Sequence, residues 1–126
     1  MCAEARRSGS EPVDGWYLAE LVVTHRSESW ETQLVHVNHV LLSAKDHEAA
    51  YDKAMRSGEA YSTTLVNCDQ EVVSVGFVGI RELFFVGSSL TDGMELFHQE
   101  SSRPADASFE DWIVPKQALS AFLRYI

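Results

Sequence analysis

The segment GWYLAELVVTH, residues 15–25, constrains the fold most, because it is apolar almost throughout and carries one carboxylate, Glu20, at its centre. Its aromatic and β-branched content is typical of a β-strand. Side chains alternate between the two faces of a strand, so Tyr17 and Leu21 are expected on one face and Glu20 on the other. A buried charge without a partner is unfavourable, so the face that carries Glu20 needs an explanation.

A second apolar segment, LVHVNHVLLSA at residues 34–44, is expected to pair with the first as a hairpin. Aligning the most apolar faces predicts a main core face made of Tyr17, Ala19, Leu21, Val23, Val35, Val37 and Leu41. Glu20 then shares the second face with His36 and Asn38, next to Trp16. Three interpretations stay open: a half-exposed face with hydrogen-bonded polar groups, a contact surface for another protein, or a catalytic carboxylate–imidazole pair.

The segment KDHEAAYDKAMRSGEA predicts one central helix. Asp46 is the expected N-cap, and Gly58 is expected to end the helix in the left-handed conformation. Further strands are expected at 60–66, 71–77, 80–87 and 94–100. A second helix is expected from Pro115 to the C-terminus. It would either cover the chain's own sheet or lie in a groove of another chain.

Together these elements predict one α+β domain over residues 15–126, in the order β-β-α-β-β-β-β-α. We expect a mostly antiparallel sheet of about five to six strands, with one central helix and a C-terminal helix. Residues 1–14 show no hydrophobic periodicity and are expected to form a disordered leader. A chain of 126 residues is long enough to bury a core without cross-links.

The charge balance limits the classes of partner. Ten basic against 19 acidic residues give a net charge of −9, which weighs against nucleic acid and anionic membranes as partners. No apolar run reaches the roughly 18–20 residues of a membrane-spanning helix, and the N-terminus lacks the apolar segment of a signal peptide. We therefore expect a cytoplasmic protein. A basic protein partner fits the charge, and self-association is left open.

The residues with reactive side chains form no recognisable catalytic or metal-binding motif. His36 and His39 point to opposite faces of a strand, and Cys2 and Cys68 lack the spacing of a zinc site. Neither a nucleophile elbow nor a phosphate-binding loop occurs. We therefore expect no metal and no cofactor. Glu95 lies among several acidic residues that would present a negative patch to a basic partner.

The order of several short motifs resembles the domain of unknown function 4288 family. The matching segments are WYLAELVV, VHVNHVLLSAKDHEAAYDKAMRSGEAY and FVGIRELFFVGSSLTDGMEL, within about residues 16–100. The resemblance implies that Glu20, Asn38 and Gly79 fit a family pattern, whereas His47 and Ile80 depart from it. The family label carries no activity, so the resemblance implies no role for any residue.

The sequence favours a non-enzymatic cytoplasmic protein–protein interaction module, of the kind that acts as an acidic inhibitor or immunity protein against a basic partner. The expected binding residues are Glu20, His36, Asn38, Trp16 and Glu95. The alternative is a small enzyme or ligand-binding domain that uses the face of Glu20, His36 and Asn38. A concave pocket with converging polar groups would favour the alternative, and a broad exposed patch would favour the module.

Overall fold

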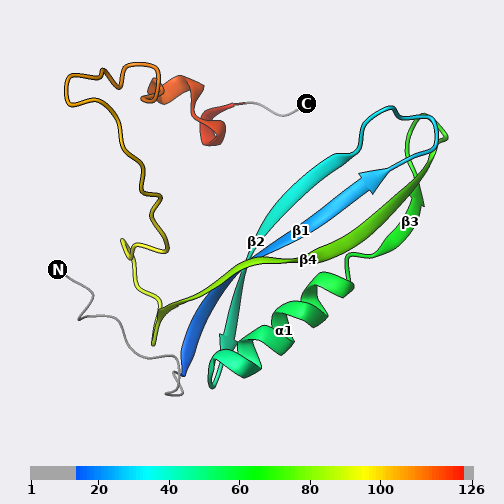
Figure 1. Cartoon of the computed structure of the whole chain (residues 1–126), viewed down its shortest axis with the longest axis horizontal. Helices are drawn as coiled ribbons and strands as arrows, with labels where there is room; N and C mark the ends of the chain where they lie inside the picture. Colours follow the sequence, from blue (N-terminus) through cyan, green and yellow to red (C-terminus); the bar gives the residue numbers. More distant parts are fainter. Residues whose placement is uncertain (1–13, 124–126) are drawn as a thin grey trace.

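The computed structural model describes residues 14–123, so residues 1–13 of the predicted leader and residues 124–126 of the predicted terminal helix lie outside the described residues. Four strands form one antiparallel sheet in the order β2-β1-β4-β3. The elements are β1 Gly15–Arg26, β2 Leu34–Ala44, α1 His47–Glu59, β3 Thr63–Val66 and β4 Val72–Gly87. The predicted α+β class with an antiparallel sheet is thereby confirmed (Figure 1).

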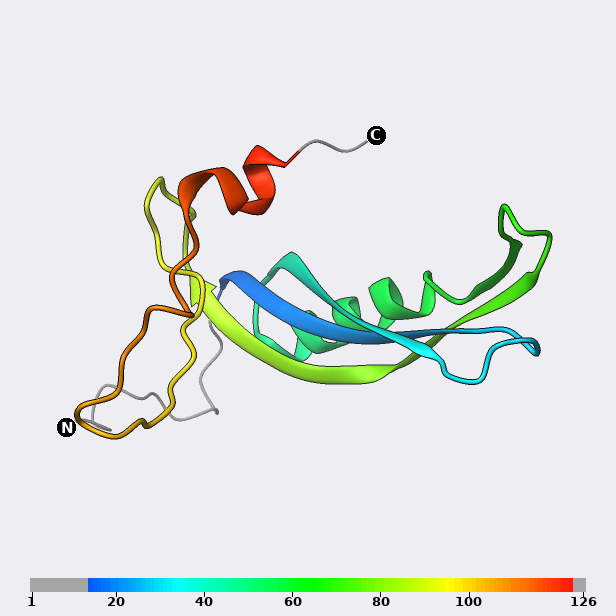
Figure 2. The same cartoon turned by 90° about the horizontal axis from the view of Figure 1, so that it is seen from above.

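Helix α1 lies across one face of the sheet (Figure 2). It begins as predicted, because the Asp46 side chain accepts a hydrogen bond of 2.8 Å from the backbone N–H of Ala49. The buried side of α1 consists of small residues at a spacing of four: Ala50, Ala54 and Gly58. Small side chains let the helix axis approach the strands closely, and Ala54 packs against Ala19 and Leu21 of β1.

The prediction for Gly58 is wrong. The helix continues to Glu59 and its C-cap, Ala60, is right-handed. Gly58 is needed for packing instead, because a Cβ atom at this position would lie 2.3 Å from the ring of Phe77. The glycine that seemed to end the helix therefore marks the point where α1 presses against β4.

The helix covers only part of this face of the sheet. Toward the far end of β1, a second buried cluster contains Val23, Val73 and Val75. The indole of Trp30, from the loop between β1 and β2, packs against this cluster. One face of the sheet is thus covered by two elements, α1 and Trp30.

Strand β4 replaces two of the predicted strands, 71–77 and 80–87, and residues 94–100 form no strand. The sheet therefore has four strands and not five or six. The pairing of β1 with β4 shifts by one residue at three places, which leaves Val78, Arg81 and Val86 as extra residues in β4. Such β-bulges bend a strand without ending it, so a segment whose alternation is interrupted still forms one continuous strand.

The predicted C-terminal helix is also wrong. The described part of this segment contains two 3₁₀ turns, Lys116–Ala118 and Ser120–Phe122, separated by the extended Leu119. Within residues 14–123 these turns contact each other but no strand and not α1, and they stand away from the sheet (Figure 1). A short helix without tertiary packing is marginal in water, so the missing contact with the sheet explains the missing helix.

Candidate functional site

Glu20 is a buried carboxylate on the face of the sheet opposite α1, with 4% of its surface exposed. The Nε atom of Arg81 donates to Glu20 Oε1 at 3.0 Å. The Nδ1 atom of His39 lies 3.8 Å from Oε2. The side chains of Arg81 and His39 are more than half exposed. The buried carboxylate of Glu20 is thus in contact with two side chains that reach solvent. Glu20 is therefore a paired charge.

The partner of Glu20 is positioned by an irregularity in the sheet. Glu20 pairs with Glu82 and Leu21 pairs with Ile80, which leaves Arg81 as the extra residue of a bulge in β4. Bulges re-aim side chains relative to regular pairing. The bulge thus explains how Arg81 reaches a carboxylate that has an acidic residue as its direct cross-strand neighbour.

The structure does not bring Glu20 together with His36 and Asn38. Opposed residues of an antiparallel pair project to the same face, and Glu20 is opposite His39, whereas Leu21 is opposite Asn38 and Val23 is opposite His36. His36 and Asn38 therefore share the face of the sheet that carries Leu21. The ring of His36 lies 4.4 Å from that of His25, measured between centroids.

The predicted core face of β2 is wrong for the same reason. Val35 and Leu41, predicted in the core, lie on the Glu20 face and are exposed, whereas Leu42 is buried beneath α1. Both parities of LVHVNHVLLSA contain three large aliphatic residues. Hydrophobicity alone therefore leaves the register of β2 ambiguous by one residue.

Trp16 and Glu95, the other predicted binding residues, have different surroundings. Trp16 lies on the Glu20 face, where it pairs with Ser43 and Gly87 at one end of the sheet. Glu95 lies beyond β4 and is exposed, and its Oε2 atom is within hydrogen-bond distance, 2.8 Å, of Nδ1 of His98. Phe97, from the same segment, packs against Phe84 with ring centroids 4.6 Å apart.

We refer to the face of Glu20 as the open face, made of Trp16, Leu18, Glu20, Val22, Val35, Val37, His39 and Leu41. No described helix covers it, as the two views of the sheet show (Figures 1 and 2). Val35 and Leu41 are 56% and 37% exposed. A described cavity of about 830 Å³ lies elsewhere, at the tips of the hairpins. The open face is thus a broad patch around an ion pair.

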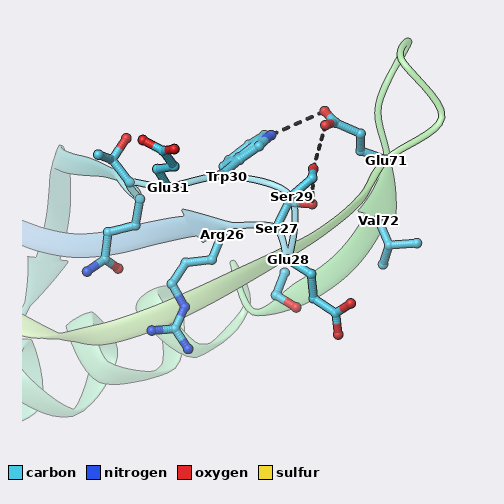
Figure 3. Close-up of a pocket in the computed structure, with 11 residues that line it drawn as sticks. Arg26, Ser27, Glu28, Ser29, Trp30, Glu31, Glu71 and Val72 are labelled. Atoms are coloured by element: carbon cyan, nitrogen blue, oxygen red, sulfur yellow. Dashed lines mark hydrogen bonds between the residues drawn. The ribbon is translucent and has the colours of Figure 1, made fainter.

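The cavity at the hairpin tips is organised by Glu71 (Figure 3). Its carboxylate accepts hydrogen bonds from Ser29 Oγ at 2.7 Å, from Trp30 Nε1 at 3.2 Å and from Asn67 Nδ2 at 2.9 Å. These donors hold the pKa of Glu71 below its ordinary value, with the Asn67 bond as the largest cause. The bonds tie the β1–β2 loop to the β3–β4 turn, which fixes Trp30 over its cluster.

Sequence reasoning missed Glu71 because it was assigned only as the first residue of the predicted strand 71–77, directly after a turn. The turn carries a recognisable signal, since Asn67 Oδ1 accepts from the backbone N–H groups of Asp69 and Glu71, as asparagine side chains do in turns. No motif in the sequence, however, links this turn to Ser29 and Trp30, about forty residues earlier.

The segment after β4, residues 88–123, extends away from the sheet and is called the arm here (Figure 1). Its large apolar side chains are exposed, among them Trp112 at 60% and Ile113 at 74%. The guanidinium of Arg103 lies 4.6 Å from the centre of the Phe109 ring and 5.0 Å from that of Trp112. Such cation–π contacts hold the two rings in a defined arrangement.

Residues 14–123 contain neither a cluster of metal ligands nor a membrane-spanning helix. No group of three or more histidine, cysteine, aspartate or glutamate side chains there is arranged to hold a metal ion. Among these residues, no helix has the length and apolar character required to cross a membrane.

Comparison with known proteins places the chain in a family. The model of the family described as "Domain of unknown function (DUF4288)" matches residues 16–98. The chain belongs to this family. The match includes Glu20, its partners His39 and Arg81, and the Glu71 cluster, whereas most of the arm lies outside it. No curated protein and no solved structure matches the chain.

Proposed function

We propose that this DUF4288 chain is a non-enzymatic cytoplasmic module that binds a basic protein, as an acidic inhibitor or immunity protein does. The observation that carries the proposal is the arm, which exposes aromatic and aliphatic side chains beside acidic ones. Phe97 packs on Phe84 of β4, but the large apolar side chains from Phe109 to Leu123 are exposed, and the two 3₁₀ turns contact no described strand. Exposed apolar groups of this size are typical of surfaces that contact other proteins.

The charge of the arm defines the chemistry of the partner. Residues 88–123 contain six acidic residues and two basic ones, Arg103 and Lys116, so the arm has a net charge of 2 − 6 = −4. Glu110 and Asp111 directly precede Trp112 and Ile113. A complementary surface would be an apolar groove bordered by lysine or arginine, and the opposite charges would speed association.

The cluster of Arg103, Phe109 and Trp112 fits the centre of such an interface. Tryptophan and arginine are enriched among residues that dominate binding energy. Their mutual contacts restrict the free arm, and fewer conformations lost on binding means higher affinity.

The open face supports the same proposal as a second contact region. It exposes Val35 and Leu41 around the Glu20–Arg81 ion pair and lies next to the segment that carries Glu95. The alternative function, an enzyme or ligand-binding domain built on Glu20, His36 and Asn38, loses its support because these three side chains do not converge.

The test uses the full-length chain as bait in its native host, followed by calorimetry with the purified partner. Trp112→Ala should weaken binding by about 30-fold or more, as expected for loss of roughly 2 kcal/mol at a central residue. Affinity should also fall as the salt concentration rises, because the attraction is between opposite charges. Tyr61→Ala, which removes an exposed aromatic group from the α1–β3 connection, is the matched control.

Two outcomes would contradict the proposal. One is a partner whose affinity is unchanged by Trp112→Ala and insensitive to salt. The other is a turnover of some substrate by the purified chain that Glu20→Gln abolishes while the melting temperature stays the same.

A further inference from the structure

The outer edge of β2 is a long strand edge that no described strand covers. β2 pairs with β1 on one side, and no described strand lies on its other side (Figure 1). It is 11 residues long, so it presents backbone donors and acceptors over roughly 36 Å at a rise of about 3.3 Å per residue. On the opposite side, β3 has only four residues and covers only Val72–Val75 of β4, so the edge of β4 from Gly76 to Gly87 also has no described strand beside it.

β2 lacks the features by which proteins block such an edge. The segment LVHVNHVLLSA contains no proline, lysine, arginine, aspartate or glutamate, and its pairing with β1 runs without a bulge. Prolines, charges, bulges and short length are the usual protections of an edge strand. The edge of β3 is protected because it is short, and the open edge of β4 is interrupted by bulges and carries Arg81 and Glu82. β2 has none of these protections, and within the described residues only its Ser43 carbonyl is occupied, by a hydrogen bond of 2.6 Å from Lys53 Nζ.

We propose that β2 pairs with β2 of a second copy, which forms a two-fold symmetric dimer with one continuous eight-stranded antiparallel sheet. Two-fold symmetry uses the same surface on both chains, and an antiparallel strand is complementary to itself when it pairs about its own centre. β2 is centred on His39, so pairing about this residue places Val37 of one chain opposite Leu41 of the other.

The side-chain pattern of β2 is compatible with this arrangement. When β2 pairs with its copy about His39, each odd-numbered residue lies opposite another odd-numbered residue, and opposed residues project to the same face. Val35, Val37 and Leu41 of both chains would then lie on one combined open face, where they bury part of each other's exposed apolar surface. Both copies of α1 would lie on the other face.

The overall charge opposes contact between two copies, and β2 is a part of the chain where no acidic side chain adds to that repulsion. Each chain carries a net charge of −9, so two chains associate most readily through a segment without acidic residues. β2 is such a segment, and a basic partner strand would find no carboxylate on it. The inference does not rest on the proposed function, which assigns partner binding to the arm.

The first test is the mass of the full-length chain by analytical ultracentrifugation. We expect a species of twice 14.1 kDa at micromolar concentration. Val37→Lys with Leu41→Lys places lysines opposite each other and should raise the dimer dissociation constant by about tenfold or more. Thr64→Lys with Val66→Lys adds the same charge to exposed positions of β3 and should leave the dimer intact. Circular dichroism establishes that both variants fold.

The second test locates the symmetry axis. Single cysteines at Val37, His39 and Leu41 are introduced into a background with Cys2→Ser and Cys68→Ser. A residue on the axis faces its own copy at about 4.5–5.5 Å between Cα atoms, which permits a disulfide bond. We expect rapid cross-linking of the His39→Cys chain and slow cross-linking of a Thr64→Cys control.

Three results would overturn the inference. The wild-type chain could sediment as a monomer up to about 100 μM, a concentration at which a dimer with a dissociation constant of about 1 μM would be almost fully formed. The lysine pair on β2 could leave the dimer unchanged. Deleting residues 102–126 could abolish the dimer, which would assign self-association to the arm.

Discussion

The two faces of the sheet bury residues in different ways. On the covered face, Leu21 and Val23 are fully buried because α1 and Trp30 form a second layer. On the open face, Leu18 and Glu20 are also buried, although no described helix lies above them. There Arg81 contacts Glu20, and Phe97 packs on Phe84, the cross-strand neighbour of Leu18. Burial on the open face therefore depends on a few side chains, and burial on the covered face depends on packed elements.

The largest effect should come from truncating the covered face. Leu21→Ala removes a fully buried side chain beneath α1. We expect the free energy of unfolding to fall by about 2–5 kcal/mol. Leu41→Ala, on the open face, should change stability by about 0.5 kcal/mol or less, measured below the concentration at which chains associate. Urea unfolding of the two variants measures the difference. Similar losses would mean that the open face is covered in solution.

A smaller loss should follow from breaking the ion pair on the open face. Arg81→Met keeps the aliphatic stem but leaves the buried Glu20 carboxylate without its 3.0 Å donor. We expect a loss of about 1–2 kcal/mol, because hydrogen bonds to charged groups contribute somewhat more than neutral ones and Arg81 is partly solvated. A double-mutant cycle with Glu20→Gln isolates the interaction. Additive losses in that cycle would refute the pairing. Arg26→Met, at the exposed end of β1, is the control.

The attachment of α1 to the covered face can be weakened at its first turn. Asp46→Ala removes the acceptor for the Ala49 N–H, and we expect a loss of about 0.5–2 kcal/mol. Asp52→Ala removes a carboxylate from the exposed middle of the same helix and should have little effect. A thermal melt of both variants tests the comparison, and equal melting temperatures would contradict the capping role.

The smallest effect concerns Glu71, which holds Trp30 over the far end of the covered face. Since the pKa of Glu71 is lowered by its hydrogen bonds, the carboxylate stabilises the fold above its ordinary value of 4.5, and this contribution is lost as the pH falls further. Glu71→Gln should therefore reduce the melting temperature near neutral pH but lose less than the wild type on acidification below 4.5. If the melting temperatures of the variant and the wild type fell by the same amount across that pH range, Glu71 would not hold the loop.

Local features of the fold could be predicted from the sequence, because they depend on neighbouring residues. The strand at 16–25, the separation of Glu20 from Leu21, and the cap at Asp46 all follow from alternation or from a hydrogen bond over three residues. The family was recognisable for the same reason, since its motifs are short and ordered along the chain.

Features that depend on distant contacts could not be predicted. The partner of Glu20 is 61 residues away and reaches it through a bulge, and the register of β2 is undetermined by its own apolar pattern. The terminal helix was predicted from amphipathicity, but amphipathicity stabilises a helix only where a surface receives it. The two 3₁₀ turns in this segment contact no strand and no helix within the described part of the chain.

Each of the three bulges in β4 changes which residues of the strand project toward the covered face of the sheet. From Trp16 to Arg26, 11 residues of β1 face 14 residues of β4, from Ser74 to Gly87. Each extra residue exchanges the inward and outward positions of everything that follows, so the inward residues Val75, Phe77, Ile80, Leu83 and Phe85 are spaced by two, three, three and two. A relative that lacked one of these residues would have to shift every apolar position on one side of the deletion by one. We therefore expect gaps to be rare in β4 across the family, and more frequent in the connecting loops.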